Sequence, residues 1–450
     1  MLTSGEDCIF TAELQDLSLE EILHYVWRHR QLPLKPLVPT QGLPLEVIDP
    51  GVLNTDAGPD FLQAKIKIGN TVWVGHVEVH LKSSDWYVHS HHVNPAYDMV
   101  VLHVVQTADR AVYNSHGEIV PQTIVPIPPR IKERFEDLRR TSRYPRCYSI
   151  LPHLSAFEIH RWMNSLMVER MADRQVQIIA RLARLNEEWN DCLFATLARN
   201  FGFGLNGDTF ERWALSFSLR AVDKHRNNLL QVEAIFFGQA GLLDDVAASP
   251  FAERKLEMDL YWKELRREYD YLSHKFGLLP ISHVDWKLLR TRPHNFPHIR
   301  IAQLAYLYYL QQIDLSRLME CTTVKQVKGM LIGGTSDYWK RHYGFGLPIP
   351  EMQRQLGHST RDLLLINSVI PFLVAYRRHR LQDENLIFSW LEEIKPENNQ
   401  MIRLWMECGV VPQHAGDSQA LIQLQQKYCN QNRCLHCRFG YYYMCKETKT

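Results

Sequence analysis

The sequence FLQAKIKIGNTVWVGHVEVHLK at residues 61–82 contains two runs in which polar and apolar side chains alternate, separated by Gly69-Asn70. Alternation with a period of two predicts two β-strands, and the Gly-Asn pair predicts a tight hairpin turn between them. Similar runs at 45–51 and 99–106 predict two more strands. The chain is therefore expected to open with a mixed α/β sheet domain.

Helical patterns surround this sheet. Ser18 with Glu21 forms a capping box for a helix over residues 18–30, and Ser155 with Glu158 forms another. After Pro152 the apolar spacing becomes helical: one long helix or two are expected to end at Gly202 and Gly204. Further helices are expected at 210–222, 229–237, 251–276, 301–312 and 361–380.

These patterns predict an α+β chain in three parts. Residues 1–150 form the sheet domain, 151–425 form a mostly helical region, and 426–450 form a cysteine-rich tail.

The composition excludes a disordered chain, because 45% hydrophobic and 11% aromatic residues at a net charge of +1 favour a packed core. With such a balance of charge the protein as a whole does not attract nucleic acid. Binding to nucleic acid would therefore need local basic patches. Residues 1–18 lack the apolar run of a signal peptide, and the most apolar run, 363–376, is too short to cross a bilayer. A cytoplasmic protein with no membrane contact is expected.

Carboxylates and histidines gather around the hairpin. Asp60 opens the first strand after Gly58-Pro59, and the hairpin is expected to bring it near Glu78 on the second. Two adjacent carboxylates repel unless a cation lies between them, which predicts a Mg²⁺ or Mn²⁺ site. The alternative is a polar sheet face on which Asp60 closes a turn. Alternation assigns the second strand's core face to Trp73, Val77, Val79 and Leu81, and its other face to His76, Glu78, His80 and Lys82.

The Gly58-Pro59-Asp60 turn and Glu78-Val79-His80 resemble the motif of the PD-(D/E)XK phosphodiesterase superfamily, which includes restriction endonucleases. Glu20 and Glu21 lie on a preceding helix, as in many such folds. The resemblance implies a restriction-endonuclease-like domain in which the acids bind magnesium and a lysine orients or deprotonates the attacking water. His80 stands at the lysine position here, and Lys82 follows on the same strand face.

Over nearly its full length the chain also resembles an uncharacterised bacterial family, domain of unknown function 2851, common in Bacteroidetes. The resemblance lies in NTDAGPDF (54–61), GHVEVHLKSSDWYVHSHHVNPAYDMVVLHVV (75–105), SDYWKRHYGFG (336–346) and the C-terminal cysteines. It implies no activity.

The segment after the hairpin is rich in side chains that bind substrates. Ser84, Asp85, His89, His91 and Tyr97 are expected to line the same site as Asp60 and Glu78. If the segment is extended, His89 and His91 share a face and could hold a metal or a phosphate. His103, within an apolar run, is expected to be a core histidine.

The tail carries Cys429, Cys434, Cys437 and Cys445 in a spacing that suits a metal site. Four thiolates bind Zn²⁺ or a 4Fe–4S cluster, and four buried thiols are the alternative. Some PD-(D/E)XK nucleases carry such a cluster, usually with one ligand from before the nuclease domain. Because all four cysteines here are local, zinc is preferred.

Two basic segments are expected to be structural. Residues 129–146 carry seven Lys and Arg against three acids and favour a solvated connecting helix over a phosphate-contacting segment. The aromatic and basic residues at 336–346 favour packing over base stacking.

The leading hypothesis is a metal-dependent phosphodiesterase that cleaves nucleic acid, with Asp60 and Glu78 on the metal and His80 or Lys82 managing the water. The alternative is a binding protein that keeps the nuclease scaffold without catalysis. Its partner would be nucleic acid or an unidentified protein.

Overall fold

The computed structural model describes residues 19–33, 37–40, 42–244, 259–288 and 291–446. Contacts divide the chain into two units, described separately: residues 1–154 with 426–450, and residues 155–425. The expected helix cap at Ser18 and the first part of the helix expected at 251–276 lie outside the described residues.

The first unit is built on a six-stranded mixed sheet with the order β1-β3-β4-β5-β6, in which β2 also pairs with β3. β1, β3 and β4 are antiparallel, whereas β5 and β6 continue parallel to β4. The strands are β1 (Leu45–Asp49), β2 (Val52–Leu53), β3 (Phe61–Ile68), β4 (Thr71–Lys82), β5 (Val100–Thr107) and β6 (Gln122–Ile124). The strands and the Gly69-Asn70 hairpin expected from the sequence are therefore confirmed.

A β-bulge in β3 changes the register next to the carboxylates. Ala64 pairs with Gly75, but Phe61 pairs with Val77, so one extra residue has entered β3 between the two pairs. Gln63, within the bulge, has a left-handed backbone with φ 55°. Continued one residue further, this register sets Asp60 opposite Glu78.

Strand β4 does not have the expected core face and polar face. Its last part is buried on both sides, because Glu78 and His80 are as buried as Val77 and Val79. Trp73, expected in the core, is 49% exposed. β3 pairs with β4 from Thr71 to Val77 and β5 pairs with it from His76 to Lys82, so the part of β4 that is buried on both faces is the part beside β5.

A helix over residues 19–28 precedes the sheet. It buries Ile22, Val26 and Trp27, as expected from their spacing, and Trp27 Nε1 donates a hydrogen bond to the Pro50 carbonyl at 3.0 Å. The other helices of the unit are α2 (Asp85–Val88), the 3-10 helices η1 (His91–Val93), η2 (Pro95–Tyr97) and η3 (Tyr148–His153), α3 (Pro129–Arg140), the 3-10 helix η10 (Cys434–His436) and α19 (Arg438–Cys445).

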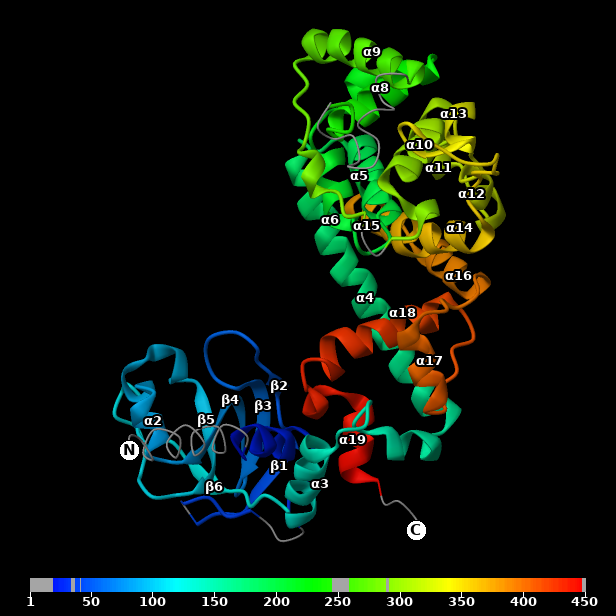
Figure 1. The fold of residues 1–450 in the computed structure, drawn as a ribbon. Coiled ribbons are helices and arrows are strands. Elements are labelled where there is room, and N and C mark those ends of the chain that lie inside the picture. Colours follow the sequence, from blue (N-terminus) through cyan, green and yellow to red (C-terminus); the bar gives the residue numbers. More distant parts are fainter. Residues whose placement is uncertain (1–18, 34–36, 41, 245–258, 289–290, 447–450) are drawn as a thin grey trace, which may run out of the picture. The chain divides into compact units, whose positions relative to one another are not determined.

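The tail helix α19 packs on α3 (Figure 1). Arg134 of α3 donates hydrogen bonds to the carbonyls of Tyr443 and Lys446, both at 2.6 Å, and Tyr443 Oη is hydrogen-bonded to Asp137. These bonds satisfy carbonyls at the C-terminal end of α19. The expectation of a solvated connecting helix is therefore wrong for this face of α3, which holds the tail.

The second unit is helical, as expected, and has one large core of buried aromatic and aliphatic side chains. Ser155 and Glu158 form the expected capping box, and of the two expected alternatives, one long helix or two, the structure has two helices. The helices are α4 (Ala156–Arg184), α5 (Trp189–Phe201), α6 (Gly207–Ala214), α7 (Leu219–Asp223), α8 (Leu229–Gln239), α9 (Leu260–Phe276), α10 (Pro297–Tyr309), α11 (Leu315–Met319), α12 (Val324–Met330), α13 (Asp337–Lys340), α14 (His358–Leu364), α15 (Ile370–His379), α16 (Asn385–Glu393), α17 (Gln400–Glu407) and α18 (Ala415–Gln423).

The segment at 336–346 packs, as expected. Trp339 is fully buried and stacks on Phe237 with ring centroids 4.9 Å apart. In the described part of the chain, no helix has both the length and the apolar character needed to cross a membrane.

Candidate metal centre

The bulge and the hairpin bring Asp60 and Glu78 together. The backbone N–H of Asp60 donates to Glu78 Oε2 at 3.1 Å, and the backbone N–H of Val79 donates to Asp60 Oδ2 at 3.0 Å. Glu78 is 4% exposed. One oxygen of each carboxylate is thus fixed by a backbone amide, and the rest of the Glu78 carboxylate faces a group of imidazoles.

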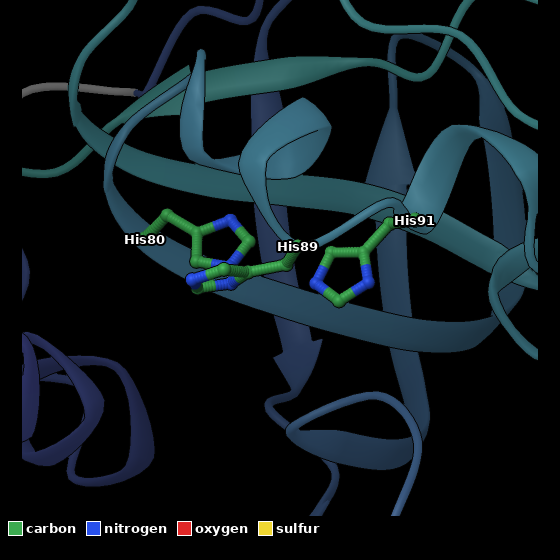
Figure 2. Close-up of side chains that lie close together, drawn as sticks. All are labelled: His80, His89 and His91. Atoms are coloured by element: carbon green, nitrogen blue, oxygen red, sulfur yellow. The ribbon is translucent and has the colours of Figure 1, made fainter.

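Three imidazoles meet beside Glu78. Ligand atoms of His80, His89 and His91 lie within 4.8 Å of one another, and Figure 2 shows the three rings close together. His80 Nε2 is 3.1 Å from His89 Nδ1. Glu78 Oε1 lies 3.5 Å from His80 Nε2 and 3.1 Å from His91 Nε2. Four groups of metal-binding type therefore converge, three of them nitrogen ligands.

His89 and His91 converge through a turn, not along a strand. His89 ends α2, Ser90 adopts a left-handed backbone with φ 59°, and His91 begins η1. The segment is therefore not extended. The two rings instead meet because the chain reverses at Ser90.

A small aromatic core holds the imidazoles in place. His91 stacks on Tyr97 with ring centroids 3.7 Å apart, and Trp86 contacts the rings of both His91 and His103. His103 Nε2 lies 3.0 Å from His80 Nδ1. His103 is a fully buried histidine, as expected, and it also orients His80.

The helix at 19–28 adds two groups that the hairpin pattern did not identify as ligands. His24 Nε2 lies 3.3 Å from Asp60 Oδ2, and Glu20 is close enough to interact electrostatically with His24, Asp60 and Glu78. The spacing of four residues puts Glu20 and His24 on one helix face, which is the signal that could have identified them.

Burial governs the protonation of the centre. It raises the pKa of Glu78, with a further rise from the Asp60 carboxylate, and it raises the pKa of Glu20 to about 7. Burial lowers the pKa of His91 to about 4 and that of His103 to about 3, and His80 shifts in the same direction. The His80, His91 and His103 imidazoles are therefore neutral at neutral pH, which is the form that binds metals.

The residues fit a bound cation. Both ring nitrogens of His91 are buried without a hydrogen bond, although Nε2 is close to Glu78, and a buried nitrogen without a partner is costly. Neutral imidazoles with a carboxylate suit Zn²⁺ and similar transition metals, whereas Mg²⁺ prefers oxygen ligands only. The donor set therefore differs from the expected pair of carboxylates.

Lys82, Ser84 and Asp85 lie at the far end of β4 from the hairpin. Lys82 is exposed, its backbone N–H donates to Asp85 Oδ2 at 3.1 Å, and Ser84 Oγ donates to Asp109 Oδ2 at 2.8 Å. Asp85 is close enough to Glu20 to raise its pKa. Tyr97 is buried against His91. Its pKa is raised to about 12, mainly by burial and to a smaller extent by the charge of Glu78.

The cysteines of the tail are divided by the structure. Cys429, Cys434 and Cys437 line one cavity, whereas Cys445 Sγ lies 3.3 Å from Tyr25 Oη.

The model of one protein family matches residues 20–400 of the chain. The chain belongs to the DUF2851 family, described as a protein of unknown function. The match to DUF2851 includes every residue of the histidine and carboxylate centre, and it ends before the tail cysteines. No curated protein and no solved structure gives a significant match.

Proposed function

We propose that this DUF2851 protein is a metal-dependent hydrolase that cleaves phosphodiester bonds in nucleic acid. The observation that carries the proposal is the convergence of His80, His89 and His91 beside the buried carboxylate of Glu78. The phosphodiester substrate rests on the resemblance of the Asp60 and Glu78 motif to PD-(D/E)XK nucleases.

His80, His89 and His91 would hold the ion. A divalent ion bound there would supply Lewis-acid chemistry toward a water and a phosphoryl oxygen. Glu78 would serve as the general base toward a water in the site, since its Oε1 faces the imidazoles and its pKa is raised. Asp60 positions Glu78 by fixing Oε2, and His24 contacts Asp60 from behind.

The roles proposed here differ from those that the resemblance implies, in which Asp60 and Glu78 bind magnesium and a lysine manages the water. Two observations favour the histidine assignment. Lys82 is exposed at the end of β4, and His80, at the lysine position, lies among the other imidazoles.

A binding protein without catalysis is the second candidate. The observation in its favour is that both ring nitrogens of His80 have partners, His103 and His89, as in a purely structural network. In that case the centre would stabilise the sheet, and nucleic acid or a protein would bind elsewhere.

The test combines metal analysis with cleavage assays. Purified full-length protein is loaded with Zn²⁺, Mn²⁺ or Mg²⁺ and given labelled single-stranded and double-stranded DNA and RNA. We expect cleavage with Zn²⁺ or Mn²⁺, a loss of at least about 100-fold in Glu78→Gln with the metal retained, and loss of both metal and activity in His91→Ala.

Glu46→Gln is the matched control, because Glu46 is an exposed carboxylate on β1 of the same sheet. It should behave as wild type. Activity that depends on Mg²⁺ and survives His91→Ala would show that Asp60 and Glu78 are the metal ligands, as the sequence alone predicts. Absence of cleavage on every substrate, with the metal bound, would favour the binding protein.

A further inference from the structure

A fourth cysteine, far away in the sequence, joins the cysteines of the tail. Cys147 lies just before η3, and with Cys429, Cys434 and Cys437 it lines one cavity inside the first unit. The remaining lining residues are Tyr144, Arg146, Tyr428 and Gly440.

Electrostatics supports the grouping. Burial raises the pKa of the Cys147 thiol, and Cys437, Cys429 and Cys434 raise it further. The charge of Arg146 acts on Cys434 in the opposite direction. Four cysteines therefore share one cavity, two of them buried and two half-buried, and Arg146 in its lining can balance thiolate charge.

The spacing of the sulfurs separates two kinds of metal site. In a zinc site the Zn–S distance of about 2.3 Å places tetrahedral sulfurs roughly 3.8 Å apart. Among the residues that the structure describes, only His80, His89 and His91 form a group of three or more ligand atoms within 4.8 Å of one another. No three sulfurs of these described cysteines therefore all lie within 4.8 Å of one another, although a tetrahedral zinc site would hold them that close. In a 4Fe–4S cluster each cysteine thiolate binds a different iron, so the cysteine sulfurs lie further apart than in a zinc site.

We propose that Cys147, Cys429, Cys434 and Cys437 hold a 4Fe–4S cluster in the cavity that they line. The proposal differs from the sequence-based expectation on two points. Cys147 takes the place of Cys445, and an iron–sulfur cluster takes the place of zinc.

The cluster would fix the tail against the helix that carries Glu20 and His24. Cys445 Sγ lies 3.3 Å from Tyr25 Oη, and the rings of His29 and Tyr441 lie 4.7 Å apart. Loss of the cluster would therefore loosen a support of the histidine centre, although it would leave the ligands of that centre in the chain.

The test is anaerobic purification of the full chain, followed by iron, acid-labile sulfide and zinc analysis. We expect on the order of four irons and four sulfides per chain and a visible absorption that bleaches with dithionite. Cys147→Ser should lose the iron and sulfide. Cys445→Ser, the matched control in the same tail, should keep them.

Three results would overturn the proposal: one zinc per chain without iron, iron without sulfide, or loss of the cluster in Cys445→Ser but not in Cys147→Ser. The wild-type iron and sulfide measurement stands even if Cys147→Ser fails to fold. Iron content is also independent of nucleic-acid cleavage, so failure of the cluster and failure of the hydrolase are distinguishable.

Discussion

Asp60 and Glu78 are joined by a hydrogen bond from the backbone N–H of Asp60 to the side-chain Oε2 of Glu78. The backbone N–H of Val79, the next residue on β4, donates a hydrogen bond to Asp60 Oδ2. Each carboxylate is thereby held by the strand that carries the other. The pair stays together because of the register of the sheet, even though the two charges repel.

The bulge at Gln63 is predicted to be essential for this register. Gln63→Val would disfavour the left-handed backbone of the bulge; regular pairing with residue 63 retained would set Asp60 opposite Val79 and separate the carboxylates. We expect cleavage to fall by at least about 100-fold, measured on the same oligonucleotides. Gln63→Gly is the control: glycine accepts the left-handed backbone, so activity should persist. Wild-type activity in Gln63→Val would contradict the role of the bulge.

His80 and Lys82 are predicted to behave differently. His80→Ala should remove a metal ligand and lower both metal affinity and cleavage by at least about 100-fold, whereas Lys82→Ala should retain the metal. The measurement is metal content by mass spectrometry together with cleavage rate. If His80→Ala keeps its metal but loses activity, His80 is instead the base, and because burial lowers its pKa the wild-type activity should persist well below a pH of about 6.5. Loss of activity only in Lys82→Ala would assign the water to Lys82.

The metal-free protein is predicted to lose stability as pH rises above about 6.5. The pKa values of Glu78 and Glu20 are raised in the folded state. In this pH range the native protein therefore keeps protons on these two carboxyl groups that the unfolded chain has released. His80, His91 and His103, whose pKa values are lowered, are neutral in both states in this range and add no slope.

Thermal unfolding of chelator-treated protein measures this effect. We expect the midpoint to fall by a few degrees as pH rises, and Glu78→Gln to flatten the slope. Added Zn²⁺ should reverse the fall. A slope that is unchanged in Glu78→Gln would show that another group carries it.

Gly440→Ala is predicted to damage the cysteine site. A Cβ at Gly440 would lie 2.0 Å from the Cys434 carbonyl oxygen, so the loop that carries Cys434 would have to move. We expect lower iron content and a lower unfolding midpoint. Gly329→Ala is the matched control, because Gly329 is also helical and its added Cβ meets nothing within 4 Å. Equal iron content in the two variants would contradict the prediction.

The sheet was predictable because alternation and a Gly-Asn turn are local signals. The burial of Glu78 and His80 was not predictable from the sequence. It depends on the parallel pairing of β5 with β4 and on the elements that cover the two faces of the sheet. The bulge at Gln63 was also hidden: nothing in the local pattern marks the residue whose backbone turns left-handed.

The candidate centre was partly predictable. Asp60, Glu78, His89 and His91 were grouped correctly from their crowding, but the position of His24 depends on how the first helix docks on the sheet. Cys147 could not be chosen over Cys445 from spacing, because 281 residues lie between Cys147 and Cys429 in the sequence. Such long-range pairings leave no periodic signal.

The first unit is made from two separated segments of the chain, and this sets an order of events during synthesis. A ribosome releases Cys147 long before Cys429, and the whole of residues 155–425 comes between them. The sheet can fold while the helical unit is still being made, but α19 and the cavity cannot form until the later segment emerges. A chain that stops anywhere within the helical unit would therefore carry His80, His89 and His91 but lack α19 and three of the four cysteines that line the cavity.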